Sequence, residues 1–108
     1  MASPTPAERT AATDLLAYLG ASPSPFHAVA EARRRLEAAG FSAVDQAGAF
    51  PTGPGRHFVA RDGSLVAWIV PEGAPRHAPF RLVGAHTDSP NLRIKPQPDR
   101  DRAGWRQL

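Results

Sequence analysis

The sequence predicts an α/β fold, in which two amino-terminal helices precede a β-hairpin and a buried central strand. Three observations carry this prediction. Two stretches with apolar residues at helical spacing each begin next to a proline. An Asp-Gly pair then separates two β-rich runs, which is a strong signal for a hairpin. A largely apolar run, Phe80–Ala85, follows and is typical of a strand in the middle of a sheet.

Length and composition limit the kinds of site that this chain can form. It has 108 residues, which suits one small domain or a piece of a larger one. It has no cysteine, so disulfides and thiolate metal sites are excluded. A metal would have to be held by His, Asp or Glu, which favours zinc, manganese or a similar ion.

The chain is basic, with a formal net charge of +3. The run Arg33–Arg35 leaves open a non-enzymatic basic binding module that takes nucleic acid. However, the run lies inside a predicted helix and no aromatic residues interleave with it, so a solvated helix face is favoured and no nucleic-acid partner is expected. The early residues lack a signal-peptide pattern, and no apolar run approaches the ~20 residues that span a bilayer. We therefore expect a cytoplasmic protein with no membrane partner.

The first helix is predicted over Pro6–Leu19. Proline suits a first helical turn, and Glu8 complements the positive end of the helix dipole. Gly20 is a natural stop. The apolar face of this helix is formed by Leu15, Leu16, Tyr18 and Leu19.

The second helix is predicted to begin with Ser24 as its N-cap and Pro25 at its first position. Glu31 and Arg35 have the i,i+4 spacing of an ion pair on one helix face. Gly40 ends this helix. We expect both helices to cover the faces of the sheet.

The hairpin is predicted from Arg56–Arg61, the turn Asp62-Gly63 and the strand Ser64–Val70. The second strand is apolar on both faces, which predicts a central position in the sheet and a buried Trp68. The preceding stretch, Ser42–Gly55, has the composition of a loop.

The chain becomes polar at His86, directly after the strand Phe80–Ala85. In open α/β sheets, ligands bind beyond the carboxyl ends of the strands. Side chains alternate along a strand, so His86 and Asp88 should share one side while Thr87 takes the other. A carboxylate at this spacing can orient an imidazole, and a metal-ligating histidine generally has such a partner. A polar strand end with an inert histidine is the simpler alternative.

Two further interpretations concern the residues around this motif. A serine hydrolase that uses Ser89, Asp88 and His86 is disfavoured, because adjacent residues of one strand cannot form the relay geometry and no Gly-x-Ser-x-Gly elbow is present. A short strand is predicted over Leu92–Lys95, where apolar and basic residues alternate. The remaining histidines are interpreted as structural or surface residues: His27, His57 and His77.

Three segments resemble the aspartyl aminopeptidases, which form metallopeptidase family eighteen. The first resembles that family's first zinc-site motif and reads Gly84-Ala85-His86-Thr87-Asp88-Ser89-Pro90, followed by Leu92-Arg93-Ile94-Lys95-Pro96. The second resembles a helix-opening segment and reads Ala21-Ser22-Pro23-Ser24-Pro25-Phe26-His27-Ala28-Val29. The third is the tail, Gly104-Trp105-Arg106-Gln107-Leu108. The similarity covers nearly the whole chain in the right order.

The resemblance implies a two-zinc aminopeptidase of the cytosol that assembles into a large homo-oligomer. Such enzymes release an amino-terminal residue, preferentially Asp or Glu, from peptides. In the family pattern the motif histidine is a zinc ligand, which here is His86. The aspartate two residues later is the catalytic residue that supports it, which here is Asp88.

The chain departs from the family in length. Family members are several times longer, and their other zinc ligands and general-base glutamate lie beyond the position that corresponds to Leu108. Residues 1–108 are therefore expected to be an incomplete amino-terminal part of the catalytic metallopeptidase domain. We expect the chain alone to be inactive.

Overall fold

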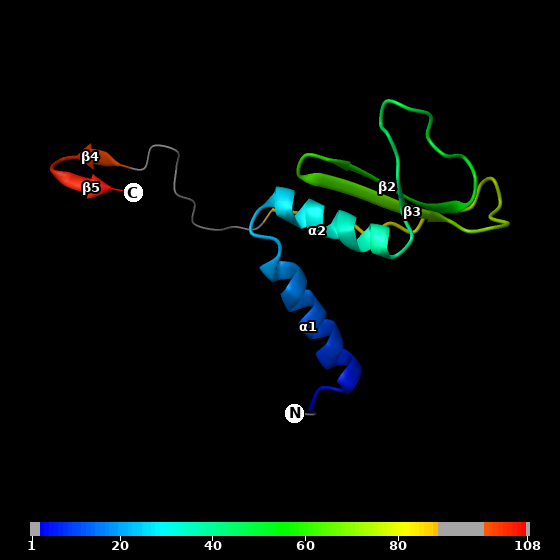
Figure 1. The fold of residues 1–108 in the computed structure, drawn as a ribbon, viewed down its shortest axis with the longest axis horizontal. Coiled ribbons are helices and arrows are strands. Elements are labelled where there is room, and N and C mark those ends of the chain that lie inside the picture. The colour runs from blue at the N-terminus through cyan, green and yellow to red at the C-terminus, as the bar shows by residue number, and fades with distance from the viewer. Residues whose placement is uncertain (1–2, 89–98, 108) are drawn as a thin grey trace.

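A computed structural model describes residues 3–88 and 99–107 of the chain (Figure 1). Two helices are followed by a mixed three-stranded sheet, and a separate two-stranded ribbon comes last. The elements in chain order are α1 (Pro6–Gly20), α2 (Pro25–Ala38), β1 (Ser42–Ala43), β2 (Gly55–Arg61), β3 (Ser64–Val70), β4 (Arg100–Arg102) and β5 (Trp105–Gln107). Both helices and the hairpin lie within one residue of their predicted bounds. No helix in the described ranges is long and apolar enough to cross a membrane.

The three-stranded sheet has the order β1-β2-β3. Strand β2 pairs antiparallel with β3, and the register places Arg61 opposite Ser64, so Asp62 and Gly63 alone form the turn. Asp62 takes a positive φ of 51°, a conformation that Asp tolerates better than most residues. Strand β1 is parallel to β2 and lies in the stretch predicted as a loop. Two residues are too few to give a strand pattern in the sequence.

The core lies between α2 and one face of the sheet (Figure 1). Phe58 on β2 is 1% exposed, and Ala28 and Val29 on α2 are 5% and 6% exposed. The small and β-branched residues of α2 let the helix lie close to the aromatic ring. Burial of Phe58 is therefore the largest single apolar contribution within this unit.

The predicted central position of the second hairpin strand is wrong. The central strand is β2, while β3 forms the edge of the described sheet. Val66 and Ile69 are 64% and 54% exposed, and Trp68 is only half-buried. A strand apolar on both faces is buried only if layers cover both faces, and α2 covers one.

The prediction that both helices cover the sheet is also wrong, because α1 projects away from it (Figure 1). The leucines of its apolar face are exposed: Leu15, Leu16 and Leu19. Helix α1 is tied to α2 through its second half. Arg35 donates from Nη1 to both carboxylate oxygens of Asp14 at 2.8 Å, and the Tyr18 hydroxyl donates to the carbonyl of Ala28 at 3.2 Å.

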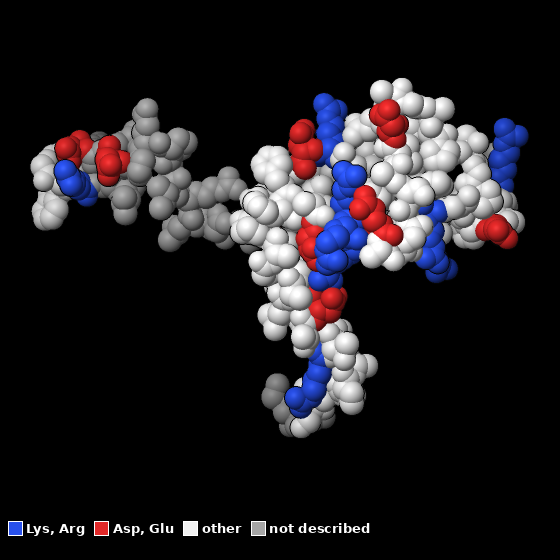
Figure 2. All heavy atoms as spheres, in the orientation of Figure 1, with Lys and Arg blue, Asp and Glu red and all other residues white. Residues whose placement is uncertain are grey.

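The arginine run is neutralised along α2, as predicted for a solvated helix face. Figure 2 shows acidic and basic side chains intermixed over this helix. The ion pairs are Arg33 with Glu37 at 2.9 Å, Arg34 with Glu31 at 2.7 Å and Arg35 with Glu31 at 2.8 Å, the last being the predicted i,i+4 pair. The two arginines hold the pKa of Glu31 at about 2, with the hydrogen bond from Arg34 as the larger cause.

The strand predicted over residues 80–85 is not formed. Residues 78–86 have no regular secondary structure, and Phe80, Leu82 and Val83 are 76%, 89% and 99% exposed. A strand that is apolar on both faces needs hydrogen-bonded neighbours and two covering layers. The described residues supply neither to this segment. The strand predicted over residues 92–95 lies outside the described residues.

Sequence analysis missed the ribbon formed by β4 and β5. Its register pairs Arg102 with Trp105, so Ala103 and Gly104 form a two-residue turn. Both turn residues have positive φ, 53° and 81°. A glycine in such a turn and the aromatic Trp105 after it are the local signals that the sequence offers, since the other strand residues are polar or charged.

Candidate functional site

The predicted motif lies beside the hairpin turn. The Thr87 hydroxyl donates a hydrogen bond of 2.6 Å to the carbonyl oxygen of Gly63, between β2 and β3. His86 and Asp88 contact each other instead, and both side chains are 78% exposed. This arrangement agrees with the predicted alternation, in which Thr87 takes one side and its two neighbours the other.

The imidazole of His86 is hydrogen-bonded to the backbone of Asp88 and lies near the Asp88 carboxylate. Nδ1 of His86 lies 2.5 Å from the backbone carbonyl oxygen of Asp88 and 3.5 Å from its Oδ1. The shorter contact therefore goes to the carbonyl, whereas the sequence predicted the carboxylate. A carbonyl oxygen only accepts, so Nδ1 carries the proton and the lone pair of the neutral ring is on Nε2. That nitrogen is the one available to a metal.

His86, with Asp88 beside it, is suited to be one ligand of a zinc ion. A histidine whose Nδ1–H is held by a carbonyl or carboxylate is the usual form of a zinc-ligating imidazole. A catalytic zinc generally has three protein ligands and one open position. Within residues 3–88 and 99–107, no group of three or more His, Asp or Glu side chains could hold a metal ion. His86 and Asp88 could thus supply one ligand and its supporting acid, and the described residues place no further ligand beside them.

His27 makes a local contact and His77 is exposed, as predicted, whereas His57, interpreted as a surface residue, has its Nε2 atom buried. His27 lies in the first turn of α2, where its Nδ1 is 2.8 Å from the hydroxyl of Ser24. His57 packs on Trp68 with ring centroids 5.7 Å apart. Its ring also lies close over Gly55, where a Cβ atom would be 2.5 Å from Nε2. His57 is therefore part of the packing on the hairpin.

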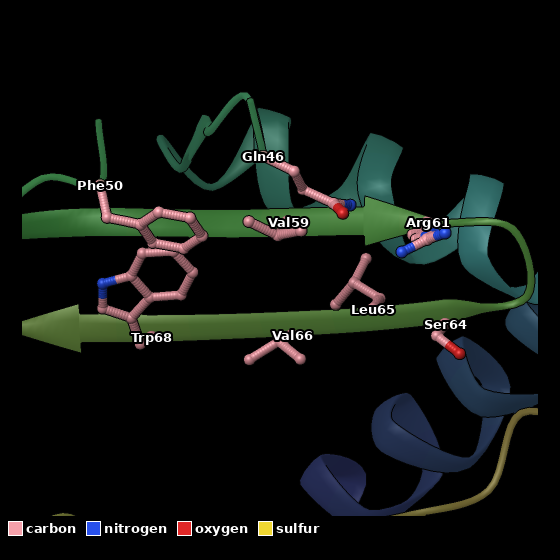
Figure 3. Close-up of a pocket in the computed structure, with 8 residues that line it drawn as sticks. All are labelled: Gln46, Phe50, Val59, Arg61, Ser64, Leu65, Val66 and Trp68. Carbon is pink, nitrogen blue, oxygen red and sulfur yellow. The ribbon is translucent and has the colours of Figure 1, made fainter. Parts of the chain in front are cut away.

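A hollow of about 490 Å³ lies on the face of the sheet away from α2 (Figure 3). Phe50 stacks on Trp68 at its end, with ring centroids 6.0 Å apart, and Val59 and Val66 form its floor. Sequence analysis did not predict this hollow, because Phe50 lies in a stretch interpreted only as a loop. Its lining is mainly apolar and contains no paired acid or base for chemistry.

Comparisons with known proteins identify relatives over almost the whole chain. A family model described as "Aminopeptidase I zinc metalloprotease (M18)" matches residues 18–108. The chain is 54% identical over 108 residues to a probable M18 family aminopeptidase 2 of Streptomyces avermitilis. It is 54% identical over 95 residues to the protein of the same description from Mycobacterium leprae.

These relatives are much longer than the chain. The match covers all of the chain but 25% of the Streptomyces avermitilis protein, and 88% of the chain but 22% of the Mycobacterium leprae protein. A solved structure titled "Cryo-EM structure of the Ape4 and Nbr1 complex" contains a similar chain, with a TM-score of 0.77 and 28% identity. That likeness covers 93% of this chain and 20% of the solved one.

Proposed function

This chain belongs to the M18 family of zinc metalloproteases, and we propose that it supplies one part of the active site of an aminopeptidase. The observation that carries the proposal is the geometry of His86, whose Nδ1 is held by Asp88 while Nε2 is left for a metal. Both residues lie inside the matched range, 18–108. Three quarters of the Streptomyces avermitilis relative lies outside the match, which gives ample length for other ligands.

In this proposal the complete site holds two zinc ions and acts in the cytoplasm within a homo-oligomer. Its substrates are peptides, and it releases their amino-terminal residue with a preference for Asp or Glu. Bound zinc supplies Lewis acidity, which polarises the scissile carbonyl and makes a water nucleophilic near neutral pH. His86 binds through Nε2, and Asp88 fixes the tautomer and orientation of the ring. The general base and the other ligands come from outside the described residues.

The proposed role of Asp88 can be tested by a substitution of its side chain. Asp88→Asn keeps the shape and the backbone carbonyl contact but removes the negative charge 3.5 Å from Nδ1. Residues that support a metal ligand typically change affinity or activity by about 10–100-fold when altered. A similar loss should appear in the rate while thermal unfolding is unchanged, because Asp88 is exposed. Wild-type rate and metal affinity would make Asp88 an ordinary surface residue.

The experiment uses a hybrid enzyme, in which this chain replaces the matched segment of the Streptomyces avermitilis relative. Purified hybrid enzyme and the 108-residue chain are assayed with zinc on chromogenic substrates that begin with Asp, Glu, Leu or Lys. We expect zinc-dependent release by the hybrid enzyme, fastest for Asp or Glu, and none by the chain alone. Turnover of a substrate by the 108-residue chain alone would contradict the proposal that this chain supplies only one part of the site.

A further inference from the structure

We propose that Thr87 is a positioning residue, whose hydroxyl fixes the His86–Asp88 pair to the hairpin turn. The inference rests on the proposed function, because it concerns the presentation of His86 to a metal. The Thr87 side chain does not face the imidazole. It acts through the backbone, by holding the residue between the two functional side chains.

The first support is that the motif segment has few other ties. Residues 79–88 form no strand, and their apolar side chains are exposed. The helix–hairpin unit comprises residues 24–70. Among the hydrogen bonds of the described residues, the bond from Thr87 to Gly63 is the one that joins the motif segment to this unit. The contact between His86 and Asp88 is internal to the segment. Without the Thr87 hydroxyl, His86 and Asp88 would stay in contact with each other but would no longer be held beside the hairpin turn.

The second support is that the accepting carbonyl is itself firmly placed. Gly63 lies in a two-residue turn whose ends are fixed by pairing of Arg61 with Ser64. A Cβ atom at Gly63 would be 3.2 Å from the Cβ of Pro25, so the turn lies against the first residue of α2. The Ser24 hydroxyl caps that helix start by accepting from the His27 amide. Thr87 therefore binds the point where the hairpin meets the capped helix.

The third support is the direction that this bond imposes. Thr87 is tied on the side of the hairpin turn, while His86 and Asp88 remain 78% exposed and in contact with each other. This leaves the His86 side chain exposed, so that ligands from other segments can reach it. Such pre-orientation matters because a zinc ligand must be held close to its bonding geometry.

The experiment compares variants that differ only at a threonine, each made in the 108-residue chain and in the hybrid enzyme. Thr87→Val has nearly the same shape but cannot donate, and Thr87→Ser restores the hydroxyl. The matched control is Thr13→Val, because the Thr13 hydroxyl also donates to a backbone carbonyl, that of Arg9 at 2.9 Å, but within α1. The amide shift of Phe58 reports whether each variant keeps the core.

Two measurements are made on each variant. The backbone ¹⁵N heteronuclear NOE of residues 86–88 in the 108-residue chain reports the order of the segment, and zinc titration of the hybrid enzyme carrying the same substitution reports metal affinity. We expect Thr87→Val to lower the NOE in the chain and to raise the zinc Kd of the hybrid enzyme about 10-fold, the lower end of the range for residues that orient a ligand. Thr87→Ser and Thr13→Val should match the unsubstituted proteins in both measurements.

The outcomes separate this inference from the proposed function. An NOE in Thr87→Val equal to that of the unsubstituted chain would overturn the positioning role, as would a lowered NOE with an unchanged Kd. Failure of Thr87→Ser to restore both values would also overturn it. If His86→Ala leaves zinc binding by the hybrid enzyme unchanged, the proposed ligand role fails, and the NOE comparison in the 108-residue chain still decides whether Thr87 holds the segment.

Discussion

The helix–hairpin unit of residues 24–70 and the motif segment of residues 79–88 are stabilised in different ways. In the first, α2 and the paired strands β2 and β3 enclose Phe58, and the helix cap and the hairpin turn are each made by residues within three positions of one another. In the second, Phe80 and Val83 are 76% and 99% exposed, and among the described residues one long-range hydrogen bond joins the segment to the helix–hairpin unit. The unit has a packed core, while the segment contains the proposed zinc ligand.

The two regions show which neighbours each kind of sequence signal needs before the predicted structure forms. A cap, a turn or an i,i+4 pair is satisfied by residues a few positions away, so it forms wherever the local chain is present. An apolar strand is satisfied only by neighbouring strands and covering layers. The segment has the sequence of a buried strand and, in the described residues, the surroundings of a surface loop.

The largest expected effect compares one substitution in the two regions. Phe58→Ala should lower the free energy of unfolding by about 3–5 kcal/mol, because the ring is fully buried. Phe80→Ala should change it by less than about 0.5 kcal/mol, because the ring is exposed. Urea denaturation of the 108-residue chain measures both. Equal losses would mean that the segment packs as tightly as the hairpin.

Trp68→Ala should have an intermediate effect, about 1–2 kcal/mol. Its half-buried ring contacts Phe50 and His57 on the face of the sheet that no described helix covers. Tryptophan fluorescence and denaturation of this variant and of Phe50→Ala test that placement. A loss as large as that of Phe58→Ala would show that the open face is covered.

A smaller effect is expected at the start of α2. Ser24→Ala removes the hydroxyl that accepts from the His27 amide, and loss of such a cap typically costs about 1 kcal/mol. Because Gly63 lies against Pro25, the turn that receives Thr87 should loosen as well. Hydrogen exchange of the α2 amides measures the effect, and Ser24→Asp serves as the capping control. Equal protection in Ser24→Ala would exclude a role for this cap.

The smallest expected effect is on stability at low pH. It acts through Glu31, whose partner Arg35 also pairs with Asp14 of α1. Arg34 and Arg35 lower the pKa of Glu31 from 4.5 to about 2, so the charged form is favoured in the folded chain. Its contribution to stability is complete above a pH of about 4.5 and is lost as the pH falls to about 2. Glu31→Gln should flatten the dependence of unfolding on pH in this window. An unchanged slope in the variant would assign acid sensitivity to other carboxylates.

The sequence was sufficient for the locally determined parts of the fold. Pro25 after a capping serine, Gly40 after α2 and the Asp62-Gly63 pair placed the helix and the hairpin within a residue. Which faces of the strands and helices are covered could not be predicted in this way. The apolar pattern of β3 indicates two covered faces, whereas the structure covers one, and the pattern of α1 does not reveal that its leucines stay exposed.

At the candidate site, the contact between neighbouring side chains was predictable, while the longer-range contact was not. The spacing of His86 and Asp88 predicted that the two side chains would meet, and they do. The dominant contact to the backbone carbonyl of Asp88 has no sequence signature, because every residue has a carbonyl. The bond from Thr87 to Gly63 spans 24 positions and depends on where the hairpin turn comes to lie. No local pattern could indicate it.

The most direct test of the central claim is the zinc content and peptidase rate of the hybrid enzyme carrying His86→Ala. His77→Ala is the matched control, because His77 is an exposed histidine in a loop of the same chain. With His86 as a zinc ligand, His86→Ala loses bound zinc and turnover, while His77→Ala retains both. Full zinc occupancy with normal peptide hydrolysis in His86→Ala would contradict the assignment.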